Sequence, residues 1–159
     1  MTSWILAMIE PLYIKRQILN HEDIQRWAKS QGFTRVVHRN ELHITQAFIH
    51  TPVDTSRVTP LANELLLQWE PQYFRQIVHY GASVSLKFFD HTLKQRNRDI
   101  HALVEVPESK KKKFRPHFAI TYWDIPDLTH CEPYQGDIHL GPEVIMPLDP
   151  HYQVQEETI

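Results

Sequence analysis

Alternating apolar and polar residues predict most of the strands of this chain. Between residues 10 and 19, Leu12 and Ile14 fall on one face, while Tyr13 and Lys15 fall on the other, as expected of a half-buried strand. Similar runs predict strands at 40–50, 81–89, 114–123 and 134–140, and an extended closing segment at 141–149. The run at 61–69 fits a strand and a short helix equally well.

Two segments show the helical period instead. In 20–33 an apolar stripe lies between Asn20, a candidate N-cap, and Gly32, a candidate helix terminator. In 90–106 apolar residues recur two turns apart and predict a helix that begins at Asp90. The predicted order is β-α-β followed by β-α-β-β, which favours an α+β fold over a doubly wound parallel sheet. Because 159 residues can build one core, we expect a single domain over 1–159.

Composition narrows the range of partners. The formal net charge is −2 and charged residues make up 23% of the chain, so we expect no binding of long nucleic acid and no attraction to membranes, whereas a small anionic ligand fits. Cys131 is the one cysteine, which excludes an intramolecular disulfide and indicates a reducing compartment; a catalytic thiol there is the less favoured interpretation. Residues 1–16 match neither a signal peptide nor a membrane span, so we expect a cytoplasmic protein.

The candidate chemistry lies on two of the predicted strands, "LHITQAF" and "PHFAITY". Residues two apart share a face of a strand, so His43 and Thr45 present an imidazole and a hydroxyl to one spot. On the second strand the same rule groups His117 with Ala119 and Thr121. It assigns the residues between and after them to the opposite face: Phe118, Ile120 and Tyr122.

Two histidine strands that face one groove suit acid–base cleavage of a phosphodiester. A neutral histidine removes a proton from the nucleophile, a protonated one gives a proton to the leaving oxygen, and hydroxyl groups hold the non-bridging oxygens. Neither a metal nor another cofactor is needed for this chemistry. A zinc site is the weaker interpretation, because His38 and His43 are five apart and no HxH, HExxH or CxxC spacing occurs.

The histidine strands and their flanking segments resemble the 2H phosphoesterase superfamily and, within it, the phage anti-CBASS cyclic-nucleotide phosphodiesterases. The similar segments cover most of the chain and are "LYIKRQILNHEDIQRWAKSQGF", "ELHITQAFIHTPVD", "GASVSLKFF", "RPHFAITY" and "PYQGDIHLGPEV". The resemblance implies a two-lobed domain in which antiparallel sheets flank a central cleft and helices lie outside. It also implies metal-independent hydrolysis of 3′–5′ phosphodiester bonds in the cyclic di- and trinucleotide messengers of CBASS defence, with attack by the ribose 2′-hydroxyl.

The resemblance also suggests roles for individual residues. His43 and Thr45 match the first family motif, and His117 matches the histidine of the second. Tyr13 and Glu143 match positions that contact the nucleotide in the family. The alternatives are a cross-strand aromatic contact for Tyr13 and a local cap or ion pair for Glu143.

Ala119 departs from the family pattern, because it replaces the second-motif hydroxyl with a methyl group. Thr121 is a candidate replacement on the same predicted face. The run Lys110–Lys113 is interpreted as a solvated loop, with a lid that contacts the anionic ligand as the alternative. Three functions follow from these residues: an active phosphodiesterase, a protein that sequesters cyclic nucleotides because Ala119 weakens catalysis, and a 2H enzyme acting on RNA 2′,3′-cyclic phosphate ends.

Overall fold

The computed structural model describes residues 8–159. Nine strands and two α-helices are formed by these residues. In chain order they are β1 (Ile9–Ile18), α1 (His21–Ser30), β2 (Arg35–Val37), β3 (His43–Asp54), β4 (Leu65–Leu67), β5 (Arg75–Tyr80), β6 (Ser83–Phe88), α2 (His91–Leu103), β7 (His117–Thr121), β8 (Ile138–Ile145) and β9 (Glu156–Thr158).

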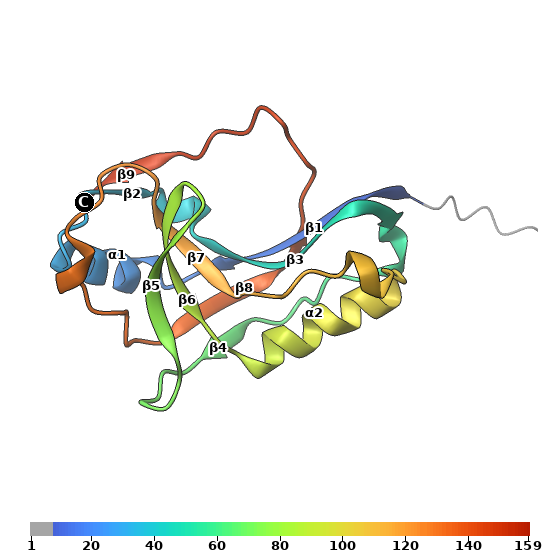
Figure 1. The fold of residues 1–159 in the computed structure, drawn as a ribbon, viewed down its shortest axis with the longest axis horizontal. Helices are drawn as coiled ribbons and strands as arrows, with labels where there is room; N and C mark the ends of the chain where they lie inside the picture. The colour runs from blue at the N-terminus through green and yellow to red at the C-terminus, as the bar shows by residue number, and fades with distance from the viewer. Residues whose placement is uncertain (1–7) are drawn as a thin grey trace, which may run out of the picture.

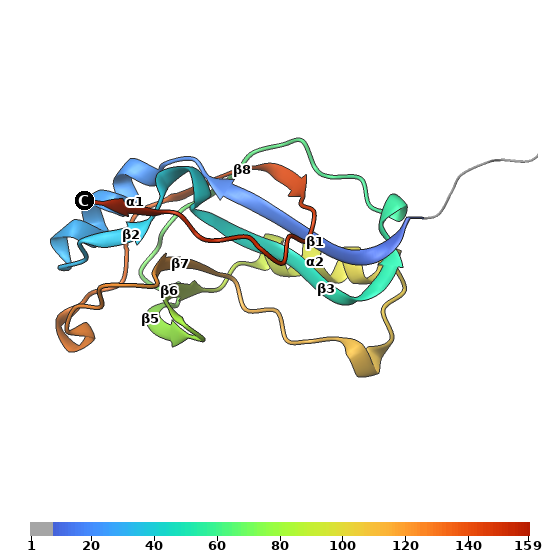
Figure 2. The ribbon, with the colours of Figure 1, turned by 90° about the horizontal axis from the view of Figure 1, so that it is seen from above.

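The strands form three antiparallel sheets. The largest has the order β3-β1-β8-β4, the second has the order β5-β6-β7, and β2 pairs with β9. In Figure 1 the C-terminus lies beside α1 and β2, as the β2–β9 pairing requires. Figure 2 shows the β5–β6–β7 sheet and the β1–β3 pair on opposite sides of the molecule. The edge strands β3 and β7 contact each other, which brings the two histidine strands together.

Two hydrophobic clusters stabilise this arrangement. The larger one lies between the sheets and α1; its buried members include Ile18, Ile44, Leu86 and Phe118. The smaller one joins α2 to β1 and β3 through residues such as Ile100. Both clusters draw on β1 and β3, because each of these strands extends from one cluster into the other.

The predicted helix ends are largely correct. Asp90 caps α2, since its side chain accepts a hydrogen bond from the Leu93 amide at 2.9 Å. Gly32 has φ +94°, the left-handed conformation that ends α1 at low steric cost. Asn20 does precede α1, but its side chain makes no cap hydrogen bond. It instead donates to the Asp137 carbonyl at 2.7 Å and so ties the start of α1 to the approach to β8.

Each histidine strand contains a β-bulge after its motif. In β3 the partners change from Ile14–Ala47 to Lys15–Thr45, so Gln46 is the extra residue. In β7 they change from Val84–Thr121 to Ser85–Ala119, so Ile120 is the extra residue. A bulge reverses the alternation of side chains beyond it.

The predicted α+β class is confirmed, and the errors concern single elements. The buried face of β1, with Leu12 and Ile14, is confirmed. The ambiguous run 61–69 contains the short strand β4, while 134–149 contains one strand, β8, in place of two segments. The sequence did not predict β2, β5 or β9. The expectation for residues 1–16 falls partly on residues 1–7, which lie outside the described residues; within 8–159 no helix is long and apolar enough to cross a membrane.

Candidate active site

The two histidines lie in one cleft, between the edge strands β3 and β7. His43 and Thr45 come from β3, while His117 and Ala119 come from β7. All four are half-buried. They line a common cavity of about 320 Å³, a size typical of small-molecule sites.

Both imidazoles are held by the same local hydrogen bond. His43 Nδ1 lies 2.6 Å from the Glu41 carbonyl oxygen, and His117 Nδ1 lies 2.7 Å from the Arg115 carbonyl oxygen. A carbonyl only accepts, so these contacts assign a proton to Nδ1 in each ring. Each neutral ring then carries its lone pair on Nε2, the nitrogen left for chemistry in the cleft.

Tyr13 contacts the first histidine directly. Its hydroxyl lies 2.9 Å from His43 Nε2, to which it donates when the ring is neutral. Burial raises the pKa of the Tyr13 hydroxyl, which keeps it protonated near neutral pH. The Tyr13 ring also packs edge-on against Phe48, with 5.4 Å between the ring centroids. The structure therefore brings Tyr13 into the site and also shows the aromatic contact given as its alternative.

Electrostatics favour the neutral form of His43. Burial is the largest cause of the lowered pKa of this imidazole, and the charges of Lys15 and His117 act in the same direction. The hydrogen bond with the Glu41 carbonyl opposes them. A neutral imidazole with an unprotonated Nε2 is the form that a general base requires.

Thr121 does not reach the cleft, so the expectation that it shares the face of His117 is wrong. Its side chain is fully buried, donates to the Arg35 carbonyl at 2.5 Å and accepts from the Trp123 amide at 3.1 Å. The bulge at Ile120 is the cause, because it turns the next side chain away from the cleft.

Glu143 also lies away from both histidines. Its carboxylate accepts hydrogen bonds from Arg96 at 2.9 and 3.0 Å and from the Leu61 amide at 3.0 Å. Arg16 approaches to 3.9 Å. The side chain is buried and lines neither cavity at the cleft. The geometry therefore shows the local ion pair given as its alternative, and the nucleotide contact stays a prediction.

Three tyrosines at the cleft were not predicted. Tyr122 lines the same cavity as Ala119, because the bulge turns it toward the cleft. Burial raises the pKa of the Tyr122 hydroxyl, so it remains a hydrogen-bond donor. Tyr80 stacks on the ring of His117 with centroids 4.1 Å apart, and Tyr152 contributes to the wall of the smaller cavity. Regular alternation gave no signal for Tyr122, since only the pairing with β6 reveals the bulge.

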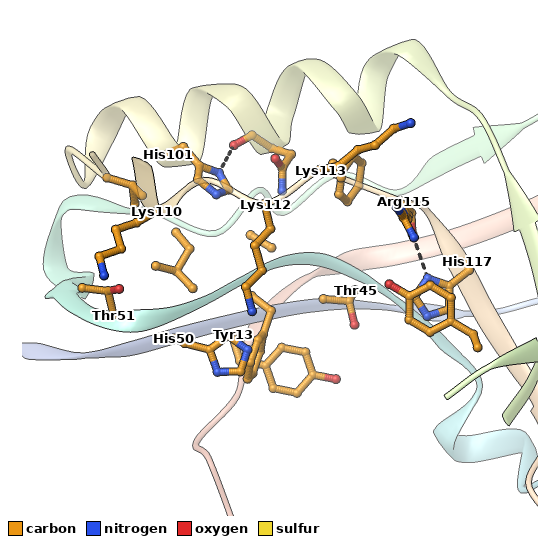
Figure 3. A pocket seen from close by; sticks show the side chains of 17 residues that line it. Tyr13, Thr45, His50, Thr51, His101, Lys110, Lys112, Lys113, Arg115 and His117 are labelled. Carbon is orange, nitrogen blue, oxygen red and sulfur yellow. Dashed lines mark hydrogen bonds between the residues drawn. The ribbon is translucent and has the colours of Figure 1, made fainter. Parts of the chain in front are cut away.

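A larger cavity of about 610 Å³ adjoins the first (Figure 3). Tyr13, Thr45 and His117 line both cavities, so His117 lies where they meet, and His43 lines the smaller one. The segment that leads into β7 forms one side of the larger cavity and supplies Lys110 and Lys112. A ligand bound at the histidines can therefore extend in two directions.

Two other candidate chemistries receive no support from the described residues. The Cys131 thiol donates to the Gln31 carbonyl at 3.4 Å, and burial raises its pKa, which disfavours the reactive thiolate. Within residues 8–159, no group of three or more His, Cys, Asp or Glu side chains is arranged to hold a metal ion.

Comparison with known proteins adds the family. The model of the family described as anti-CBASS protein Acb1 matches residues 10–155. An anti-CBASS protein Acb1 of Caulobacter sp. (strain RHG1) is 29% identical over 159 residues, which cover 90% of this chain and 23% of that protein. A second anti-CBASS protein Acb1, of Sphingomonas paeninsulae, is 30% identical over 149 residues, which cover 87% of this chain and 23% of that protein. The chain thus spans about a quarter of the length of these relatives.

Solved structures show the same fold. E. coli LigT in its apo form superposes with a TM-score of 0.57 at 13% sequence identity, and 96% of each chain is covered. E. coli LigT complexed with ATP gives 0.55 at 14% identity over 96% of each chain. The predicted α+β fold is therefore confirmed, and it resembles that of E. coli LigT over nearly the whole chain.

Proposed function

The chain belongs to the anti-CBASS protein Acb1 family, and from this premise we propose that it is a phosphodiesterase that opens cyclic di- and trinucleotide messengers. One observation carries the proposal: two histidines on facing edge strands, each held through Nδ1 by the carbonyl two residues earlier. By this proposal the protein acts in the bacterial cytoplasm, where such messengers signal, and it evades CBASS immunity by removing them.

The reaction that fits this pair is a transfer of the phosphodiester to the neighbouring ribose hydroxyl. His43 Nε2 takes the proton of the 2′-hydroxyl, and O2′ forms a bond to phosphorus as the bond from phosphorus to O5′ breaks. Protonated His117 gives its proton to O5′, which leaves a hydroxyl on one side and a 2′,3′-cyclic phosphate on the other. Water can then open that ring to a 3′-phosphate with the two histidines in exchanged roles.

The lowered pKa of His43 supports its assignment as the base. In this scheme the substrate 2′-hydroxyl takes the place of the Tyr13 hydroxyl at Nε2, because one lone pair cannot accept both protons. The hydroxyls of Thr45, Tyr13 and Tyr122 are then the donors for the non-bridging oxygens, in the manner of an oxyanion hole.

A second candidate function rests on Ala119. The methyl group removes the hydroxyl of the second motif, and Thr121 does not replace it, since its hydroxyl bonds the Arg35 carbonyl. Loss of one such donor reduces the rate by a factor of about 10²–10³ in oxyanion holes. A protein slowed to this degree would act on the messenger by sequestering it.

The test is incubation with 3′,3′-cGAMP and with cyclic triadenylate in the presence of EDTA, followed by chromatography. We expect linear products, and we expect His43→Ala and His117→Ala each to reduce their rate of formation about 10²–10⁴-fold. His130→Ala is the matched control, because His130 is exposed and lies outside both cavities. Loss of activity in EDTA would contradict the metal-independent mechanism. Intact messenger depleted from free solution would favour sequestration instead.

A further inference from the structure

The larger cavity at the cleft has a one-sided charge. Its lining includes Lys110, Lys112, Lys113 and Arg115, and no Asp or Glu of residues 8–159 lines it. The chain as a whole is slightly acidic, with 19 carboxylate side chains against 17 Lys and Arg. The smaller cavity has the opposite charge, because Glu41 lines it and no Lys or Arg of residues 8–159 does. Positive charge is therefore concentrated on one side of the histidine pair.

The lysines of this cavity are available to a ligand. Among residues 8–159 no carboxylate lies within 4.0 Å of the Lys110 or Lys112 ammonium group, whereas Lys111 between them pairs with Glu108 at 2.8 Å. In Figure 3, Lys110 and Lys112 extend from their segment across the cavity toward β3, and Lys112 reaches toward His50 and Tyr13. Two unpaired ammonium groups held over one cavity favour an anion there.

The remaining walls add hydrogen-bond donors. Thr51 and His50 line the cavity from β3, and His101 lines it from α2. The Nδ1 atom of His101 lies 2.7 Å from the Asn97 carbonyl oxygen and therefore carries the ring proton, so Nε2 of the neutral ring accepts hydrogen bonds and His101 is not one of the donors. Lysine ammonium groups together with hydroxyl and imidazole groups are a donor set suited to phosphate oxygens.

We propose that this cavity binds a second phosphate of the substrate, one that is not cleaved, through Lys110 and Lys112. The inference rests on the proposed function, which places the cleaved phosphate between His43 and His117. Because His117 lines both cavities, a ligand that runs from this point into the larger one brings its next phosphate to the lysines. The site thereby selects ligands with two or more phosphodiesters over ligands with a single phosphate, such as an RNA end.

The test measures binding with ligands that cannot be cut. Cyclic di-2′-deoxyadenylate carries two phosphodiesters, and the linear dinucleotide dApdA carries one; both lack the attacking hydroxyl. We expect the full chain to bind the cyclic ligand at least about 10-fold more tightly at 50 mM salt. The double variant Lys110→Gln/Lys112→Gln should lose about 10-fold in affinity for the cyclic ligand and less than about twofold for dApdA. Its affinity for the cyclic ligand should also depend less steeply on salt.

Lys111→Gln is the matched control, since Lys111 lies in the same run but outside the cavity lining, and its binding should equal that of the unmodified chain. The proposal would be overturned if the double variant lost no affinity or lost equal affinity for both ligands. It would also be overturned if Lys111→Gln lost as much affinity as the double variant, or if the unmodified chain showed no measurable binding. Cleavage of 3′,3′-cGAMP by the unmodified chain is scored separately. Cleavage without lysine-dependent discrimination would refute the subsite alone, and discrimination without cleavage would refute the proposed activity alone.

Discussion

At the scale of single residues, we propose that Tyr122 supplies the hydroxyl that Ala119 lacks. Ala119 stands where the resemblance to 2H phosphoesterases implies Thr or Ser, and Tyr122 lines the same cavity. The bulge at Ile120 reverses the faces of the two residues that follow it, so that Thr121 is buried and Tyr122 points toward the cleft. By this proposal the donor on this side of the transition state is the Tyr122 hydroxyl in place of a threonine hydroxyl.

Removal of the Tyr122 hydroxyl should therefore slow the reaction. We expect Tyr122→Phe to lower kcat about 10²-fold, as loss of one oxyanion donor does, with little change in KM. Addition of Ala119→Thr in the same chain should restore part of the rate, because it returns the hydroxyl of the family motif. Tyr73→Phe is the control, since Tyr73 is exposed and lines neither of the cleft cavities. An unchanged kcat in Tyr122→Phe would contradict this role.

His43 should make both activity and stability fall at acidic pH. Burial lowers its pKa in the folded protein below the ordinary value of 6.5, which the unfolded chain retains. The stability from neutral His43 is complete above about pH 6.5 and is lost as pH falls through the lowered pKa, because the unfolded state then binds more protons. The acid limb of kcat/KM should accordingly have its midpoint below pH 6.5.

Urea unfolding between pH 5 and 7.5 tests the stability part of this prediction. We expect His43→Gln to lose less free energy of unfolding than the unmodified chain between pH 7 and 5, since it lacks the titrating group. His130→Gln, at an exposed position, should retain the full pH dependence. Identical pH dependence in His43→Gln and the unmodified chain would contradict the prediction.

Several site residues could be predicted because their signal is local. His43, Thr45 and His117 follow from strand alternation and from the family motif, and the structure places all three at the cleft. Thr121 was misplaced because its orientation depends on a bulge in the pairing of β7 with β6. The ion-pair partner of Glu143 could not be predicted, because Arg96 comes from α2, 47 positions away in the chain.

At the scale of elements, Glu143 joins three of them. It lies on β8, pairs with Arg96 of α2 and lies next to Arg16 of β1. Burial lowers the pKa of the Arg16 guanidinium, and the nearby charge of Glu143 acts in the opposite direction. Removal of one partner of a buried ion pair leaves an uncompensated charge. The cluster therefore fixes α2 against the sheet, and α2 in turn supplies His101 to the larger cavity.

We expect Glu143→Gln to reduce the free energy of unfolding by about 3 kcal/mol, as loss of a buried partner does. Urea denaturation followed by circular dichroism measures this change. Glu105→Gln is the matched control: Glu105 pairs with Arg57 at the surface, and its loss should cost less than about 1 kcal/mol. The KM of the folded Glu143→Gln variant should be unchanged, whereas a nucleotide contact by Glu143 would raise it.

The elements that the sequence missed are short strands with long-range partners. β2 pairs with β9, so Val36 lies opposite Glu157 at the far end of the chain. β5 has an irregular burial pattern and gains its conformation from β6. The strands that were predicted carry apolar residues on a buried face, such as Leu12 and Ile14 in β1. Alternation of apolar and polar residues thus predicts a strand that packs on the core. It does not predict a strand that is defined only by its pairing with another strand.

At the scale of the whole molecule, we propose that the described chain is one folding unit, although it spans only about a quarter of its relatives' length. It has two hydrophobic clusters, which could in principle unfold separately. However, β1 contributes Ile18 to the larger cluster and Ile14 to the smaller one. Loss of either cluster exposes part of the same strand, so the two should unfold together.

A mutation in one cluster, read out in the other, tests this coupling. Ile100→Ala, in the smaller cluster, should cost about 2–5 kcal/mol. Trp27 packs against the larger cluster, so in a chain whose other three tryptophans are replaced by Phe, tryptophan fluorescence should report the same lowered urea midpoint as circular dichroism. Leu103→Ala, at an exposed position of the same helix, should shift both signals little. If the fluorescence midpoint stayed in place while the circular dichroism signal moved, the two clusters would be independent units, and the single-domain prediction would be wrong.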